Sequence, residues 1–169
     1  MRTDEIKLWY EYNYWANKRI LTTCAKVSDE QYVASTPFGA LRHTVVHTLD
    51  AEWSWRLTCQ GLDGKNWPQE LTEVDLPTLD ALNERWQTEE HEMRSYLNSL
   101  SDGDLDGIVR YPIDSGVIRE RVLWHCLLHV VNHGTQHRSE AAALLTSYGQ
   151  SPGGLDFTAF LNEHFNLPS

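Results

Sequence analysis

Residues Glu120 to Tyr148 read ERVLWHCLLHVVNHGTQHRSEAAALLTSY and predict one long helix that carries a regular series of histidines. Residues four apart lie one above the other on a helix face, so two imidazoles at that spacing can bind one metal ion. Each step of four turns about 40° around the helix axis, so the whole series cannot serve a single ion. One adjacent pair could do so, with a third ligand from elsewhere. The series is His125, His129, His133 and His137.

A second pair of histidines lies in the first half of the chain, at His43 and His47, again four residues apart. A single histidine on an apolar helix face is more often a hydrogen-bonded core or surface residue than a metal ligand. An unmetallated ladder is therefore the alternative interpretation, although five clustered imidazoles are hard to satisfy without an ion or water. The spacing alone leaves open which pair binds and which residue supplies the third ligand.

The rest of the chain predicts three more long amphipathic helices, because apolar residues recur at every third or fourth position. The four helices are expected at about 3–26, 40–59, 75–100 and 120–148. Ser28 and Gln31 form a capping-box pattern that predicts a short helical turn. Residues 101–118 predict a small hairpin or an extended crossover, and a short helix is expected within 155–165. The pattern indicates an all-α fold, a four-helix bundle in a single domain spanning 1–169.

Several polar and aromatic features have simple structural interpretations. Residues 61–75 predict an irregular polar connection. The aromatic residues of the first helix, among them Trp9, Tyr12 and Trp15, predict core packing, with one or two rings available to wall a pocket. The run of acidic residues in the third helix predicts a face exposed to solvent. That run contains Glu84, Glu89, Glu90 and Glu92.

Composition excludes several classes of function. The 169 residues include 24 acidic and 14 basic side chains, and the net charge of −10 argues against direct binding of nucleic acid. No apolar run is long enough to span a membrane, and the first residues do not resemble a signal peptide. Three widely spaced cysteines without a CxxC motif predict reduced thiols and a cytoplasmic location.

Three segments taken in order resemble the DinB family, the damage-inducible, YfiT-like metalloproteins built on a four-helix bundle. They are YNYWANKRIL at 12–21, HTVVHTLDAEW at 43–53 and HVVNHGTQHRSE at 129–140. The resemblance implies that His47, His133 and His137 bind a divalent metal ion, with His129 in a supporting position behind them. It implies supporting roles for Asn132 and Arg138, and it implies a homodimer.

Two carboxylates near these ligands are candidate catalytic residues. The family often has Gly-Gln after the His-Arg pair, whereas this chain has Ser139 and Glu140. Glu140 lies three residues after His137 on the same helix face, where it can orient a ligand, act as a base or lie at the rim. Asp50 lies three residues after His47 and is the other candidate base.

Three nitrogen ligands leave a coordination position for water or substrate, as catalytic zinc sites do. Zinc and nickel are the expected metals, although cobalt, iron and manganese also accept nitrogen ligands. The resemblance implies transferases or isomerases that use a low-molecular-weight thiol, such as bacillithiol or mycothiol, on a small-molecule substrate. Two alternatives remain: a hydrolase that uses metal-bound water, and a non-enzymatic, stress-related metal-binding bundle.

Overall fold

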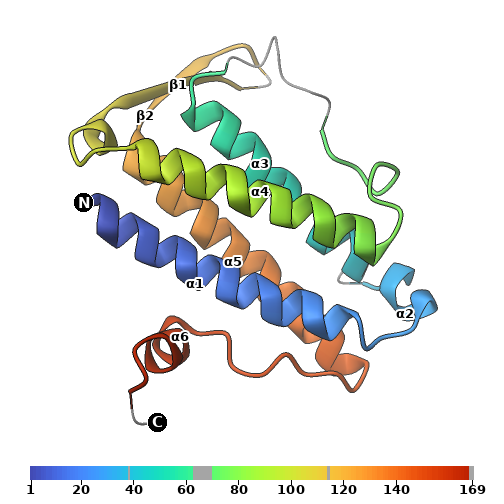
Figure 1. Ribbon diagram of the computed structural model, residues 1–169. Coiled ribbons are helices and arrows are strands. Elements are labelled where there is room, and N and C mark those ends of the chain that lie inside the picture. Colours follow the sequence, from blue (N-terminus) through green and yellow to red (C-terminus); the bar gives the residue numbers. More distant parts are fainter. Residues whose placement is uncertain (38, 63–69, 114, 168–169) are drawn as a thin grey trace.

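The computed structural model describes residues 1–37, 39–62, 70–113 and 115–167, and within these ranges the chain is predominantly helical (Figure 1). Residues 63–69 of the expected polar connection, and Asp114 in the hairpin turn, lie outside the described residues. The elements are α1 (Thr3–Cys24), α2 (Asp29–Val33), α3 (Leu41–Cys59), α4 (Leu79–Ser99), a 3-10 turn η1 (Asp104–Asp106), β1 (Ile108–Pro112), β2 (Ile118–Val122), α5 (Leu123–Ser147) and α6 (Phe157–His164).

The four long helices α1, α3, α4 and α5 lie side by side (Figure 1). Helix α5 packs most extensively against α3 and α1, and α4 contacts both of these on the other side. Helices α1 and α3 are therefore not the main neighbours of each other, although they are consecutive long helices in the sequence. The hairpin lies at one end of this assembly, α2 at the other, and α6 packs on α1.

The helix boundaries follow the capping residues. Ser28 caps α2 as predicted, since its hydroxyl accepts from the Gln31 N–H at 3.2 Å and the Gln31 side chain accepts from the Ser28 N–H. Helix α4 begins later than the predicted Asp75 or Pro77, because Thr78 provides the cap by accepting from the Ala81 N–H. Asp75 instead closes a turn by accepting from the Thr72 N–H at 2.9 Å.

The predicted hairpin is present, and it shortens α5 at its start. Residues 118–122 pair with β1, so α5 begins at Leu123 rather than Glu120. In the antiparallel register Val109 lies opposite Arg121 and Tyr111 lies opposite Arg119. Residues directly opposite each other share a face of the sheet. Because Val109 is buried, this face is the one turned toward the helices.

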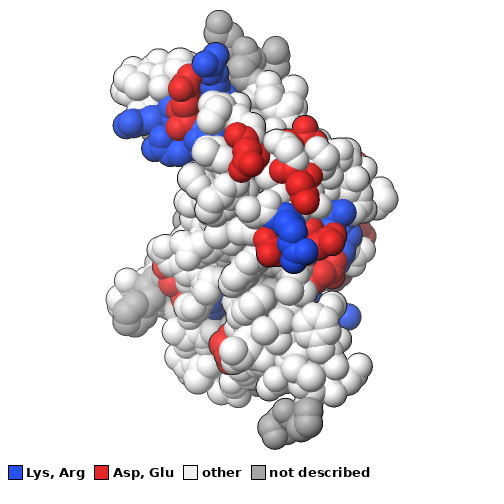
Figure 2. Space-filling model, turned by 90° about the vertical axis from the view of Figure 1, so that its left-hand side faces the viewer, with Lys and Arg blue, Asp and Glu red and all other residues white. Residues whose placement is uncertain are grey.

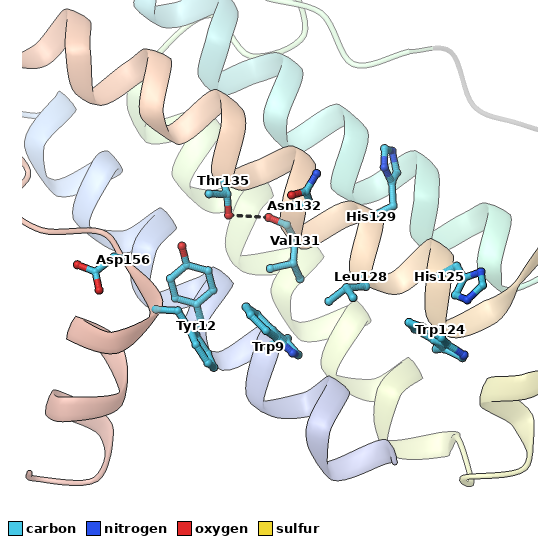
Figure 3. Close-up of a pocket in the computed structure, with 11 residues that line it drawn as sticks. Trp9, Tyr12, Trp124, His125, Leu128, His129, Val131, Asn132, Thr135 and Asp156 are labelled. Carbon is cyan, nitrogen blue, oxygen red and sulfur yellow. Dashed lines mark hydrogen bonds between the residues drawn. The ribbon is translucent and has the colours of Figure 1, made fainter. Parts of the chain in front are cut away.

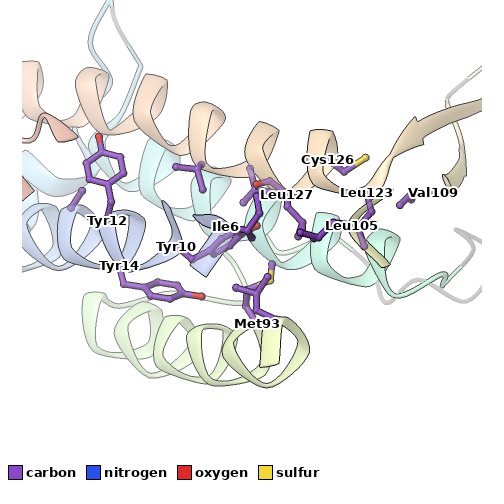
Figure 4. Packing of buried hydrophobic residues seen from close by; sticks show 14 of the residues in the cluster. Ile6, Tyr10, Tyr12, Tyr14, Met93, Leu105, Val109, Leu123, Cys126 and Leu127 are labelled. Carbon is purple, nitrogen blue, oxygen red and sulfur yellow. The ribbon is translucent and has the colours of Figure 1, made fainter. Parts of the chain in front are cut away.

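The apolar core consists of two clusters, one at each end of the long helices. The cluster near the hairpin brings together Tyr10, Met93, Leu105 and Leu127 (Figure 4). The cluster near α2 is built on other side chains of the same four helices. The prediction of core packing for the α1 aromatics holds for Tyr10, Tyr12 and Tyr14, which are buried. The main residues of the second cluster are Ile20, Leu41, Leu49, Leu82, Trp86 and Leu145.

A buried polar layer separates the two clusters. One carboxylate oxygen of Glu52 accepts from the side-chain amides of Asn13 and Asn17 at 2.7 and 2.8 Å, and the other accepts from the Trp86 indole at 3.1 Å. The guanidinium of Arg138 donates to the side-chain oxygens of both asparagines. The layer therefore joins α1, α3, α4 and α5 by directional bonds, which fix how the helices are aligned along their axes.

Gly134 makes room for this polar layer. A Cβ atom at Gly134 would lie 2.6 Å from the Arg138 guanidinium and 3.0 Å from the side-chain oxygen of Asn13. Both distances are shorter than ordinary contacts, so a larger residue would displace the arginine. Glycine within a helix is less favourable than alanine by about 1 kcal/mol. At position 134 the close approach of Arg138 and Asn13 leaves no room for a larger side chain.

A second buried ion pair corrects the interpretation of the acidic run in α4. Glu84 and Glu92 are exposed, but Glu89 is only 1% exposed. Its two carboxylate oxygens accept from the guanidinium of Arg56 at 2.6 and 2.9 Å. The prediction of a solvent-exposed face was therefore wrong for Glu89. Glu89 turns toward α3, where it meets the buried guanidinium of Arg56.

Candidate metal centre

Three histidines meet between α3 and α5. Their ligand nitrogens, one from each of His47, His133 and His137, lie within 4.8 Å of one another. The Nε2 atoms of His133 and His137 are 3.1 Å apart, and the ring centroid of His47 lies 5.2 and 4.8 Å from theirs. Nitrogens about 2.1 Å from a tetrahedral ion are roughly 3.4 Å from one another. The donor set therefore fits a single divalent ion.

The direction of the two helices explains why these three residues meet. Trp55 contacts His129, and further along α3 Cys59 interacts with Cys126, so α3 runs antiparallel to α5. His47 consequently faces the turn of α5 that carries His133 and His137. The spacing left open which pair of α5 histidines joins the group. This alignment brings His133 and His137 next to His47.

The remaining histidines of the two series lie outside the group. The side chain of His43 is 65% exposed, and its Nδ1 contacts the carboxylate of Glu73 at 3.2 Å. His125 lies against the ring of Trp124 at the start of α5. The ring of His129 packs edge-on against Trp55 at 4.9 Å. It also lies 5.8 Å from the ring of His133, which places His129 beside the group, as a supporting residue would be.

Glu140 contacts the group through His137. One of its carboxylate oxygens lies 2.7 Å from Nδ1 of His137. A carboxylate can only accept a hydrogen bond, so Nδ1 carries the proton and the lone pair is on Nε2, which faces His133. A carboxylate on the far nitrogen is the usual way to orient a metal-binding histidine. Of the three roles left open by the sequence, this geometry favours orientation of a ligand.

Asp50 has a different environment. It is buried on α3, and its carboxylate accepts from the backbone N–H of Leu71 at 2.8 Å. Burial raises the pKa of Asp50, and the hydrogen bond from Leu71 opposes that shift. The carboxylate thus anchors the segment that leads into α4. A role for Asp50 as a base would require it to release Leu71, so the catalytic role stays a prediction.

Electrostatics keep the histidine group in the form that binds metals. Burial, followed by the proximity of His137 and His47, lowers the pKa of His133 to about 4. Burial, followed by the proximity of His137, also lowers the pKa of His47. Both rings are therefore neutral at pH 7, and a neutral imidazole is the form that coordinates a metal ion.

Comparison with known proteins gives the relationship of the whole chain. The sequence model of the DinB family matches residues 1–165. This chain belongs to the DinB family. It is also similar to Protein DinB from Bacillus subtilis (strain 168), with 26% identity over 164 residues that cover 90% of this chain and 91% of the relative. The resemblance inferred from three short segments thus extends over nearly the full length.

The three segments that carry the DinB resemblance supply the polar layer as well as the three clustered histidines. Asn13 and Asn17 come from the first segment, Glu52 from the second and Arg138 from the third. The sequence predicted a supporting role for Arg138, and its bonds to the two asparagines agree with this. It did not identify Glu52, although an acidic residue before Trp53 was part of the motif. Burial of the Glu52 side chain was not predicted.

An apolar hollow lies on another side of α5 from the histidine group. Its volume is about 660 Å³, and residues of α1, α5 and the segment around α6 line it. Figure 3 shows Trp9, Tyr12 and Leu128 at this hollow, and His129 also lines it. The expectation that one or two α1 rings wall a pocket holds for Trp9 and Tyr12. This hollow does not include the three clustered histidines of the described chain.

The metal-free DinB-family protein is expected to lose stability as the pH falls from about 6.5 to 4. The pKa of His133 is near 6.5 when unfolded and about 4 when folded, so in this window the unfolded chain binds more protons. The contribution of neutral His133 to the free energy of unfolding is complete above pH 7. It is lost as the pH falls through the pKa of His133 in the folded protein, about 4. Urea unfolding at several pH values should show a shallower decline for His133→Gln. Exposed His91→Gln serves as the control, and parallel declines for the two variants would contradict the expectation.

Proposed function

We propose that this DinB-family protein is a metal-dependent enzyme in which His47, His133 and His137 bind one divalent transition metal ion, most naturally zinc or nickel. The observation that supports this proposal is the convergence of three imidazole nitrogens without a fourth protein ligand in the group formed by the described residues. We take the four long helices to be a four-helix bundle, whose core is a usual place for such metal sites.

The proposed reaction is transfer or isomerisation that depends on a low-molecular-weight thiol. A bound divalent ion would lower the pKa of a thiol and hold it as the thiolate at neutral pH. Within the chain, Glu140 holds the Nδ1 proton of His137 and so directs Nε2 into the site. His129 lies beside His133, and its ring packs edge-on against Trp55.

The alternatives are supported less well by the same residues. A hydrolase using metal-bound water needs a free general base. Both candidate bases already have partners, since Glu140 contacts His137 and Asp50 accepts from Leu71. A purely structural site, as in a stress-related metal-binding protein, usually has four protein ligands rather than three. A thiol-dependent enzyme therefore remains the function that the geometry supports best.

Metal content is the first test of this proposal. Protein purified without chelators or added histidine tags is expected to contain about one equivalent of a transition metal, because three ligands suffice for tight binding at neutral pH. His133→Ala should lose the metal, whereas the exposed and unclustered His125→Ala should retain it. Elemental analysis by mass spectrometry measures both. Equal metal content in the two variants would contradict the assigned ligands.

The thiol is tested on cobalt-substituted protein, whose absorption spectrum changes when a thiolate binds the metal. Addition of small thiols is expected to give a sulfur-to-cobalt charge-transfer band in the wild type and none in His133→Ala. A spectrum that no thiol alters would overturn the thiol-dependent reaction while leaving the metal site intact.

We further propose that the partner is a small molecule and that the protein forms a homodimer, as relatives are expected to do. No helix within the described residues has the length and apolar character needed to cross a membrane. The net charge of −10 opposes binding to nucleic acid. Sedimentation that detects only monomer at micromolar concentration would refute the homodimer.

A further inference from the structure

Two of the three cysteines meet where the end of α3 packs against the start of α5. Cys59 is the last residue of α3, and Cys126 is the fourth residue of α5. Their side chains are joined by a hydrogen bond between the two sulfurs, and both cysteines are free thiols. Cys24 lies in the core cluster at the other end of the long helices. We call Cys59 and Cys126 the cysteine pair.

Ring contacts along the two helices lead to the same pair. The ring of His47 lies 5.2 Å from that of His133. Further along α3, the ring of Trp55 lies 4.9 Å from that of His129, which is one turn earlier on α5. One more turn in these opposite directions reaches the two cysteines. The alignment of the helix backbones therefore brings the sulfurs together.

The surroundings of the cysteine pair hold it in place. The hydroxyl of Tyr96 on α4 donates to the backbone carbonyl of Cys59 at 2.9 Å, which fixes the end of α3. Cys126 belongs to the core cluster near the hairpin, and Cys59 packs against that cluster. A disulfide requires Cβ atoms about 3.5–4.5 Å apart. Thiols already in hydrogen-bond contact on two packed helices are close to that arrangement.

The two thiols differ in reactivity. The pKa of Cys126 is lowered, mainly by the hydrogen bond with Cys59 and additionally by the charge of Arg121. The same hydrogen bond, followed by burial, raises the pKa of Cys59. Cys59 is thus the donor, and Cys126 is the sulfur that carries negative charge. Viewed from the side, the largest group of basic atoms lies at this hairpin end of the molecule (Figure 2). A positive environment of this kind favours a thiolate, which is the nucleophilic form of cysteine.

A recess between α3, α5 and the hairpin gives a small oxidant access to Cys126. Its volume is about 380 Å³, and Cys126 lines it although this residue is only 2% exposed. Hydrogen peroxide is little larger than water and can enter such a space, whereas the low exposure of the sulfur hinders bulky reagents. The other residues that line the recess are Trp55, Tyr111, Arg121, His125 and His129.

We propose that the cysteine pair is a redox-sensitive modification site, which hydrogen peroxide converts into a disulfide that joins α3 to α5. The Cys126 thiolate attacks one peroxide oxygen, the O–O bond breaks, and hydroxide leaves and takes up the proton that Cys126 had released. The product at Cys126 is a sulfenic acid. The sulfur of Cys59 then displaces hydroxide from the Cys126 sulfur, and the Cys59 proton leaves with it as water. Both sulfurs are oxidised, and the peroxide is reduced to two molecules of water.

The modification is independent of the proposed metal chemistry, because neither sulfur belongs to the histidine group. In a reducing compartment, disulfides are mostly transient and serve catalysis or redox sensing. The crosslink closes a long loop, from Cys59 to Cys126, and so reduces the conformational entropy of the unfolded chain. Oxidation therefore stabilises the protein, and small thiols reverse it by thiol–disulfide exchange.

Peptide mapping of the unaltered protein is the first test. The protein is treated with hydrogen peroxide, quenched with catalase, denatured, alkylated and analysed by mass spectrometry. We expect alkylation of Cys24 only, together with a peptide in which Cys59 is linked to Cys126; after dithiothreitol all three cysteines should be alkylated. Cys24→Ala should form the same crosslink. Alkylation of all three cysteines after peroxide, or a disulfide only between separate chains, would overturn the proposal.

Dimedone, which labels sulfenic acids, tests the order of the two steps. Peroxide-treated Cys59→Ala is expected to be labelled at Cys126, because no second thiol removes the sulfenic acid. Cys126→Ala should not be labelled at Cys59. Labelling of Cys59 in Cys126→Ala, with none of Cys126 in Cys59→Ala, would overturn the assignment of Cys126 as the attacking thiolate.

Thermal unfolding tests the joining of the two helices. The oxidised wild type is expected to have a Tm about 5 °C or more above that of the reduced protein. Dithiothreitol should abolish this difference, and peroxide should not raise the Tm of Cys59→Ala. An oxidised wild type with an unchanged or lower Tm would show that the disulfide strains the fold, and would overturn a crosslink that fits the packing of α3 on α5.

Discussion

Replacing Glu89 by alanine is expected to lower the free energy of unfolding by about 3–5 kcal/mol, because the substitution leaves a buried guanidinium without its counter-charge. The side chain of Arg56 is 8% exposed and that of Glu89 is 1% exposed. Two hydrogen bonds, at 2.6 and 2.9 Å, join them. Typical domains are stable by only about 5–15 kcal/mol, so this loss would be a large part of the total.

Urea unfolding of Glu89→Ala beside Glu84→Ala measures the effect, since Glu84 is exposed on the same helix. The control is expected to change stability by about 0.5 kcal/mol or less. A double variant, Arg56→Met/Glu89→Leu, should lose less than Glu89→Ala, because it removes both charges and leaves none unpaired. If Glu89→Ala and the exposed single-residue control were equally stable, the ion pair between Arg56 on α3 and Glu89 on α4 would not be buried in solution.

The sequence places Glu89 on the apolar stripe of α4, although burial of its side chain was not predicted. Leu82, Trp86, Met93 and Leu97 form the apolar stripe of α4, and position 89 falls on that stripe, three residues after Trp86 and four before Met93. Glu89 was predicted to be exposed because its side chain is charged, and its position on the helix was not used. The partner, Arg56, lies on another helix, and a periodic pattern carries no information about which helices become neighbours.

The four long helices and the hairpin were predictable because each has a strong local signal. The start of α5 was not, because residues 118–122 suit either the end of a hairpin or the beginning of a helix, and pairing with β1 decides between them. The prediction of the histidine group has the same limit, because a local pattern does not show which helices become neighbours. Spacing identified two pairs of histidines, but the exclusion of exposed His43 depends on how α3 turns relative to α5.

The histidine group and the polar layer lie on the same stretch of helices. Arg138 directly follows His137 on α5, and Glu52 is five residues beyond His47 on α3. Adjacent residues on a helix point about 100° apart, so His137 faces α3 while Arg138 turns into the core. The bonds that connect Arg138, Asn13, Asn17 and Glu52 therefore hold α3 and α5 at the alignment that the three histidines require.

Replacing Glu52 by alanine is accordingly expected to reduce both stability and metal binding. The variant leaves the charge of Arg138 buried without a nearby carboxylate, and it leaves the indole N–H of Trp86 without its acceptor. The expected loss in the free energy of unfolding is about 3–5 kcal/mol. Metal affinity is expected to fall about tenfold or more, since supporting interactions behind metal ligands commonly contribute at least that much.

Urea unfolding of the metal-free protein and a competition titration with a chelating dye measure the two effects separately. Glu84→Ala, which removes an exposed carboxylate, is the matched control and should change neither quantity appreciably. Unfolding measured with and without saturating metal adds a consistency check, because a ligand stabilises the folded state in proportion to its affinity. A Glu52→Ala variant that is destabilised but binds metal as tightly as the wild type would show that the polar layer holds the core without aligning the histidines.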